Sequence, residues 1–153
     1  MPRIIVPRNV PAFASMDTLV NASVQEVWNV LSELEKWPEW NESVTSMKVK
    51  GPLAVGTEFI WVAGGMKIKS RIEEVEAPHR IAWSGVTMGI RAMHLWKFTS
   101  AETMTKVHTE ESFQGFIVRL FAKRMNRELK NALTQGLAAL KKEAEKRRIT
   151  TQT

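Results

Sequence analysis

The chain has 153 residues, of which 44% are hydrophobic and 25% are charged, values typical of a single globular domain. It has no cysteine, which excludes disulfides, thiolate metal sites and cysteine nucleophiles, and it has no apolar run of about 20 residues that would span a membrane. The net charge of +6 invites a nucleic-acid hypothesis, but much of the excess lies in residues 141–148, where two glutamates interrupt the basic residues as at a solvated helix end.

Residues 1–11 are predicted to form a loose N-terminal arm. Pro2, Pro7 and Pro11 interrupt this segment, so it lacks the continuous apolar core of a signal peptide. We therefore expect a cytoplasmic protein with a single domain at residues 12–148 and a short tail at residues 149–153.

A strand at residues 12–22 is followed by a helix. Ser23 and Glu26 have the spacing of a capping box, in which each side chain binds the backbone amide of the other residue. The helix is expected to end near Glu35, because the proline after Trp37 disfavours helical geometry at that tryptophan. The segment from Trp37 to Trp40 then forms a second short turn or helix, and we interpret its two indoles as a lid or a packing plug.

From residue 44 the hydrophobic period changes to two for about 70 residues, which predicts six strands joined by short turns. Gly64-Gly65 is a strong hairpin signal. Consecutive strands with short turns form an antiparallel meander, and the single charged face indicates that only the other face is covered. The predicted strands are residues 44–50, 57–63, 66–76, 80–86, 90–99 and 104–113.

The last third of the chain predicts a long amphipathic helix over residues 116–147, because apolar residues recur at three- and four-residue steps. The first turns, which contain Leu120 and Phe121, do not continue the stripe of Leu129 and Leu133. They point about 90–150° away from it. Either the helix kinks or unwinds near Met125, or its first turns cover a different part of the protein from the one that Leu129 and Leu133 cover.

Strand alternation places a mixed set of side chains on the covered face if Lys69, Arg71 and Lys97 point into water. Buried polar groups cost about 1–3 kcal/mol each unless they are hydrogen-bonded, so the polar members do not suit a pure core. An apolar enclosure with a few convergent polar groups is typical of a ligand pocket. The inward-facing set is Phe59, Trp61, Ile68, Ser70, Ile72, Ile81, Trp83, His94, Trp96, Phe98, Val107, Thr109 and Glu111.

His94 and Glu111 are the candidate catalytic residues of this set. Burial in an apolar cavity would raise the pKa of the carboxyl and lower the pKa of the imidazole, giving an acid–base pair for a reaction at an enolisable carbonyl. The alternative is a structural hydrogen bond between adjacent strands. No metal site is expected, because the three histidines are dispersed, and no cofactor is expected, because phosphate-binding motifs are missing.

Six segments resemble the helix-grip superfamily, which includes START lipid-transfer domains, pollen-allergen-type ligand binders and polyketide cyclase/dehydrase-like proteins (SRPBCC). They look like the polyketide cyclase/dehydrase-like branch and span about residues 12–145. The resemblance implies an α+β helix-grip fold, with a curved antiparallel sheet wrapped around a long C-terminal helix and two short helices after the first strand. The segments are Ser23–Trp28, Leu34–Asn41, Gly56–Phe59, Ile81–Gly85, His94–Phe98 and Val107–Ser112.

The resemblance also implies a cavity between the sheet and the long helix, which would bind a small hydrophobic molecule such as a lipid or a polyketide-like compound. In this fold the start of the long helix would lie beside the cavity mouth, where Phe116, Leu120 and Phe121 would form a gate with Trp37 and Trp40. The alternatives are a cyclase/dehydrase-type enzyme that uses His94 and Glu111, and a domain with a collapsed cavity and no ligand. Neither nucleic-acid binding nor stable membrane insertion is expected. The candidate ligand-binding residues are Phe59, Trp61, Ile68, Ser70, Trp83, His94, Trp96, Thr109, Glu111, Leu120, Phe121 and Met125.

Overall fold

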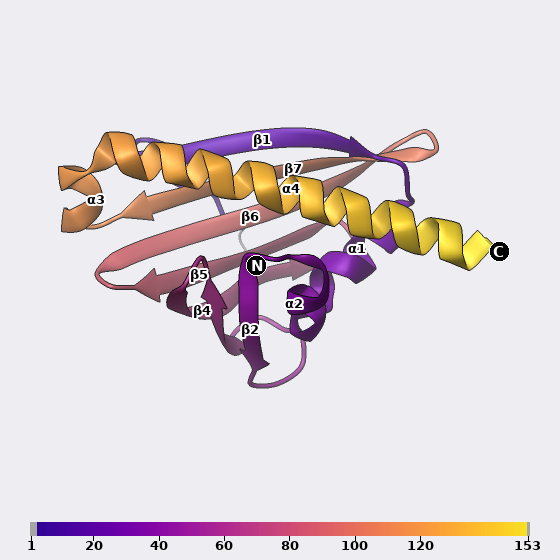
Figure 1. Cartoon of the computed structure of the whole chain (residues 1–153), viewed down its shortest axis with the longest axis horizontal. Coiled ribbons are helices and arrows are strands. Elements are labelled where there is room, and N and C mark those ends of the chain that lie inside the picture. Colours follow the sequence, from indigo (N-terminus) through magenta and orange to yellow (C-terminus); the bar gives the residue numbers. More distant parts are fainter. Residues whose placement is uncertain (1–2, 153) are drawn as a thin grey trace.

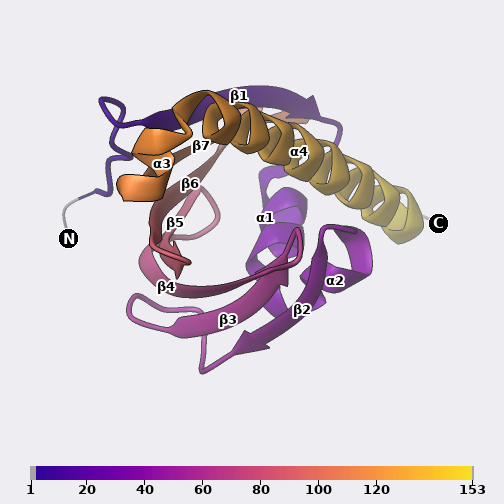
Figure 2. The same ribbon diagram turned by 60° about the vertical axis from the view of Figure 1, so that its left-hand side comes forward.

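A computed structural model describes residues 3–152 as one curved sheet with helices on its concave side (Figure 1). Figure 2 shows the sheet curving from β1 beside α4 round to β2, with α1 and α2 inside the curve. In chain order the elements are β1 (Ala12–Val20), α1 (Val24–Ser32), η1 (Leu34–Lys36), α2 (Trp37–Trp40), β2 (Val44–Val49), β3 (Glu58–Ala63), β4 (Met66–Glu76), β5 (Arg80–Thr87), β6 (Ile90–Ala101), β7 (Met104–Gln114), α3 (Phe116–Leu120) and α4 (Ala122–Gln152).

The strands form a single antiparallel sheet in the order β1-β7-β6-β5-β4-β3-β2. The meander predicted from the period-two pattern is therefore confirmed, with each strand from β2 to β7 beside the next. The Gly64-Gly65 turn joins β3 to β4, and both glycines have the positive φ that such a two-residue turn needs (58° and 80°). β1 lies at the edge of the sheet and pairs with β7, so that Ala12 is opposite Phe113. This is the predicted α+β architecture.

The capping box predicted at the start of α1 is present. The Ser23 hydroxyl oxygen accepts a hydrogen bond from the Glu26 amide, and the Glu26 carboxylate accepts one from the Ser23 amide, both at 3.1 Å. α1 ends at Ser32, a few residues earlier than predicted, and the chain continues as the 3-10 turn η1. Pro38 lies in the first turn of α2, where a missing amide costs no helical hydrogen bond.

The C-terminal helical region consists of two helices. The chain leaves helical geometry at Phe121 (φ −119°, ψ 38°), so the break lies four residues before the predicted position at Met125. α4 then runs for 31 residues, about 46 Å at ~1.5 Å per residue, and packs on β1, α1 and β7. Residues 149–152, predicted as a tail, continue α4, and Thr153 lies outside the described residues.

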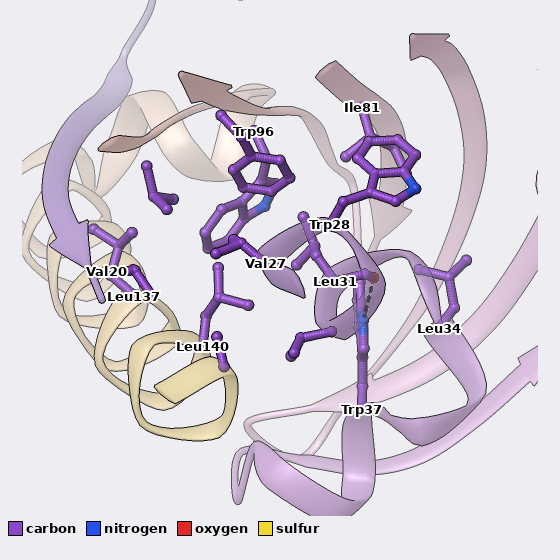
Figure 3. Packing of buried hydrophobic residues seen from close by; sticks show 14 of the residues in the cluster. Val20, Val27, Trp28, Leu31, Leu34, Trp37, Ile81, Trp96, Leu137 and Leu140 are labelled. Atoms are coloured by element: carbon purple, nitrogen blue, oxygen red, sulfur yellow. Dashed lines mark hydrogen bonds between the residues drawn. The ribbon is translucent and has the colours of Figure 1, made fainter. Parts of the chain in front are cut away.

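The concave face carries two hydrophobic clusters that share α4. The larger one, called here the tryptophan cluster, packs α1, α2 and the later turns of α4 against the sheet (Figure 3). The smaller one, called here the α3-end cluster, lies under the first turns of α4. The tryptophan cluster includes Trp28, Trp37, Trp83, Trp96, Leu137 and Leu140. The α3-end cluster consists of Ala12, Ile90, Val118, Leu129 and Leu133.

The N-terminal arm is not loose over the described residues 3–11, because it packs on the convex face of the sheet. Val6 is 1% exposed and packs against Leu95 of β6. The backbone of Ile4 is held at both ends: its amide donates to Glu74 Oε2 and its carbonyl accepts from Arg80 Nη2, each at 3.1 Å. The prolines and the lack of hydrophobic periodicity concealed this packing in the sequence.

Val6→Ala should lower the free energy of unfolding by about 1–3 kcal/mol, since it removes buried methyl groups and leaves a cavity on the sheet. Ile5 is the matched control, because it directly precedes Val6 and is 83% exposed. Ile5→Ala should change the free energy by less than about 0.5 kcal/mol. Urea titrations of both variants measure the difference. Equally small effects would mean that the arm leaves the sheet in solution.

Candidate functional site

The strand pairing confirms the predicted inward-facing register. Residues that pair directly on neighbouring strands share one face of a sheet, and here the pairs form rows across the concave face. One row contains Trp83, His94 and Glu111, and the next contains Trp96 and Thr109. Two further inward-facing pairs lie on β3 and β4: Phe59 with Ser70, and Trp61 with Ile68. The predicted ligand-binding residues that share this face are Phe59, Trp61, Ile68, Ser70, Trp83, His94, Trp96, Thr109 and Glu111.

Trp37 of α2 completes an aromatic wall on this face. Its ring centroid lies 5.3 Å from that of Trp61 and 5.3 Å from that of Trp83. Its indole N–H donates to the backbone carbonyl of Leu31 at 2.8 Å, the bond drawn in Figure 3. Trp83 continues the wall to His94, with ring centroids 4.9 Å apart. Of the two interpretations of this indole, the packing plug is therefore confirmed.

A polar group of three residues, His94, Thr109 and Glu111, separates the two hydrophobic clusters. The order is clearest along β7, where the inward side chains alternate with outward ones. Val107 belongs to the tryptophan cluster, Thr109 and Glu111 follow, and Phe113 packs against the α3-end cluster. The core is thus interrupted at its centre by side chains that can form hydrogen bonds.

Hydrogen bonds fix the position of the proton on His94. The Thr109 hydroxyl donates its single proton to the Leu95 carbonyl at 3.0 Å, so it must accept at 2.8 Å from His94 Nε2. In the neutral ring the lone pair is then on Nδ1, which lies 3.4 Å from Glu111 Oε2. That separation is longer than an ordinary N–H···O hydrogen bond. The Glu111 carboxyl has no hydrogen bond to any other residue in the described range.

Burial leaves both titratable groups uncharged near neutral pH. Loss of hydration raises the pKa of Glu111 from 4.5 to about 8 and lowers the pKa of His94 from 6.5 to about 3. A neutral carboxylic acid therefore faces a neutral imidazole. The acid can donate and accept a hydrogen bond, so it can meet a carbonyl or hydroxyl oxygen without bringing a charge into the core.

Small residues and an unpaired donor lie beside this polar group. Trp96 Nε1 is buried without a hydrogen-bond partner in residues 3–152, and the ring tip of Trp96 lies 3.9 Å from where a Cβ on Gly136 of α4 would be. In the neighbouring row Gly85 pairs with Ala92. A Cβ on Gly85 would approach the Ser70 hydroxyl at 3.2 Å, so glycine avoids a close contact at this position. From the sequence, Gly136 is expected only as part of the apolar stripe of the long helix, and neither glycine is expected to adjoin the site.

Three predicted ligand-binding residues do not join the inward-facing set. Leu120 and Phe121 are exposed at the α3 end, away from α2 (Figure 1). Met125 is half-buried against the α3-end cluster. A gate formed by these side chains with Trp37 is therefore wrong, because that indole is held in the core at the other end of the sheet.

Other sites lie away from this face. Two surface pockets of about 330 and 480 Å³ adjoin the connection between β2 and β3, and neither is lined by a predicted ligand-binding residue. Within residues 3–152 no three His, Asp or Glu side chains gather to hold a metal ion. No helix of the described range is long and apolar enough to cross a membrane.

Comparisons with known proteins agree with this architecture. Residues 14–145 match the family described as "Polyketide cyclase / dehydrase and lipid transport". A hypothetical protein from Helicobacter pylori, jhp0584, has a similar structure, with a TM-score of 0.81, 20% identity and coverage of 94% of this chain and 97% of that chain.

Two further solved structures share the fold at lower identity. The Zhui aromatase/cyclase from Streptomyces sp. R1128 has a TM-score of 0.77 at 14% identity, covering 88% of this chain and 94% of its own. A START superfamily protein from Mycobacterium smegmatis has a TM-score of 0.68 at 14% identity, covering 88% and 97%. A search of curated proteins gave no match. Because the family match covers most of the sequence, this chain belongs to the polyketide cyclase/dehydrase and lipid transport family.

Proposed function

We propose that this chain binds a small hydrophobic molecule with a hydrogen-bonding oxygen, on the concave face of the sheet beside α4. The observation that carries the proposal is the Glu111 carboxyl. It is 15% exposed, uncharged near neutral pH, and without a hydrogen bond among the described residues. Apolar surroundings with a few unpaired polar groups are characteristic of ligand sites. The family description, which includes lipid transport, supports a lipid or polyketide-like ligand.

Binding would satisfy groups that the free protein leaves unpaired. The Glu111 carboxylic acid and the Trp96 N–H are both donors, so the complementary group on the ligand is a carbonyl, hydroxyl or carboxylic-acid oxygen. Leaving a buried donor unpaired costs about 1–3 kcal/mol, which a correctly placed ligand oxygen would recover. The aromatic wall from Trp37 to His94 would support the flat or extended apolar body of the molecule.

Native mass spectrometry of the purified protein, with solvent extraction of any retained compound, is the first test. We expect a retained molecule, or a response of the tryptophan emission to a fatty acid, a sterol or an aromatic polyketide. Glu111→Leu should weaken binding about tenfold or more, whereas Glu111→Gln, which keeps a neutral hydrogen-bonding group, should bind nearly as well. Glu42→Gln, on an exposed turn, is the control and should bind like the wild type.

Either of two outcomes would refute this function. A protein that is empty and unresponsive to the whole panel would favour the collapsed domain with no ligand. A ligand whose affinity is the same for wild type and Glu111→Leu would bind at another place.

An acid–base enzyme is the second candidate, because the two groups have complementary roles. Nδ1 of neutral His94 is a proton acceptor, and the Glu111 acid 3.4 Å away is a proton donor. The first could take a proton from the carbon beside a ketone while the second protonates the carbonyl oxygen. Hydrogen–deuterium exchange at that carbon, followed by NMR, tests this reaction. His94→Gln and Glu111→Gln should each slow it by about 100-fold or more if the pair is catalytic.

A further inference from the structure

The α3 end of the molecule exposes large apolar side chains from two distant segments. Met88, in the turn between β5 and β6, is 75% exposed, and Phe116 is 73% exposed. The two segments touch, since a Cβ on Gly115 (φ 134°) would collide with the backbone carbonyl of Gly89. Figures 1 and 2 show the β5–β6 turn and α3 at the same end of the sheet. The exposed large apolar residues of the β5–β6 turn and of residues 116–121 are Met88, Phe116, Ile117, Leu120 and Phe121.

Uncompensated positive charge surrounds these side chains. Residues 84–93 and 112–127 contain no Asp or Glu, although they contain Arg91, Arg119, Lys123, Arg124 and Arg127. All five are exposed, and none forms an ion pair with a described residue. Lys67 joins them, because the Thr87 hydroxyl donates to its backbone carbonyl at 2.8 Å and so holds β4 beside this turn. The end is both apolar and basic.

This combination matches the boundary between headgroups and acyl chains of an anionic membrane. Apolar side chains enter the acyl boundary, while Lys and Arg pair with lipid phosphates, each contributing about 1 kcal/mol. A stable protein partner usually needs about 800 Å² of matched surface on each side, much more than a five-residue helix and one turn offer.

We propose that the α3 end docks this chain reversibly on anionic membranes. Phe116, Leu120 and Met88 enter the acyl boundary, and the basic residues of α3 and early α4 lie at the level of the phosphates. The inward-facing residues take no part in this contact. Docking is therefore independent of the proposed ligand site, and the two can fail separately.

A single fluorophore can report the insertion, because the chain contains no cysteine. Leu120→Cys labelled with an environment-sensitive dye should shift to the blue with phosphatidylcholine vesicles that contain about 30 mol% phosphatidylglycerol, at about 0.05 M salt. The shift should disappear at about 0.5 M salt and with pure phosphatidylcholine. Ile149→Cys is the control: it is also exposed beside basic residues, but at the far end of α4, and should not shift.

Vesicle sedimentation of unlabelled protein tests the charges. Lys123→Glu with Arg124→Glu should lower the partition coefficient on anionic vesicles by about tenfold or more. Lys142→Glu with Lys146→Glu changes the net charge equally at the other end of the helix and should lower it by less than about threefold.

Three results would overturn the docking surface. A missing blue shift at Leu120 means that these side chains stay in water. Equal losses from the two charge pairs mean that binding follows net charge alone. A concentration-dependent dimer, seen by analytical ultracentrifugation and abolished by Phe116→Ser, would assign the face to a second copy of the chain.

Discussion

Trp37→Ala should destabilise the protein by about 3–5 kcal/mol, among the largest losses expected for one substitution in this chain. The indole is buried and in contact with Phe59, Trp61 and Trp83, so its removal leaves a cavity that rigid β-strands cannot close. The Leu31 carbonyl would also lose its hydrogen bond, at the end of α1. Chemical denaturation followed by circular dichroism measures the change.

Two variants of the same short helix make this result specific. Trp37→Phe keeps a ring in the wall but removes the N–H donor, so it should cost clearly less than the alanine variant. Trp40 is only half-buried, and Trp40→Ala should also be milder. If the Trp37 and Trp40 alanine variants were equally mild, α2 would be a mobile lid in solution and not a plug of the core.

The wild-type protein should lose about 1 kcal/mol of unfolding free energy between about pH 7 and about pH 8, with a slope of at most ~1.4 kcal/mol per pH unit. The pKa of Glu111 is about 8 in the folded state, against 4.5 for an ordinary carboxyl. In this interval the folded state therefore holds a proton that the unfolded state has lost. Its stability falls as pH rises, until the folded carboxyl has ionised.

Glu111→Gln should remove this dependence, since an amide does not ionise. The variant should give a flat profile over the same interval, so that its stability relative to the wild type rises by about 1 kcal/mol between about pH 7 and about pH 8. Parallel profiles for the two proteins would mean that the Glu111 carboxyl is already charged at neutral pH.

His94 acts in the opposite direction and at lower pH. Its pKa is lowered from 6.5 to about 3, so the unfolded state binds the extra proton as the pH falls below 6.5. The combined contribution of His94 and Glu111 to the free energy of unfolding should therefore be most favourable between about pH 4.5 and about pH 6.5. Above this range the ionisation of Glu111 lowers it, and below this range the protonation of His94 lowers it.

Much of the sheet could be predicted from the sequence because its information is local. The period-two pattern and the charged residues Lys69 and Lys97 fix which side chains point inward, and these place His94, Thr109 and Glu111 on one face. Gly64-Gly65 fixes a hairpin by backbone geometry alone.

The missed features depend on contacts between distant parts of the chain. Nothing near Trp37 indicates that Trp61 and Trp83 will surround it, and nothing near Val6 indicates the apolar patch on β6 that covers it. The position of the helix break also escaped, because amphipathic periodicity shows that Leu120 and Phe121 change direction but does not identify the residue where helical geometry stops. The unpaired state of Glu111 depends on atomic distances that a strand pattern does not contain.

The pairing of β1 with β7 has a consequence for how the chain is made. β1 is synthesised before every other strand of this sheet, but its partner strand and the helix that covers it lie about 90 residues or more further along. The hairpins from β2 to β7 can form as they are synthesised, because each partner follows directly. β1 must wait with unpaired backbone groups, which in a strand edge invite pairing with another chain. The strand made first is thus the one that can join the sheet only at the end, when closure against α4 completes the domain.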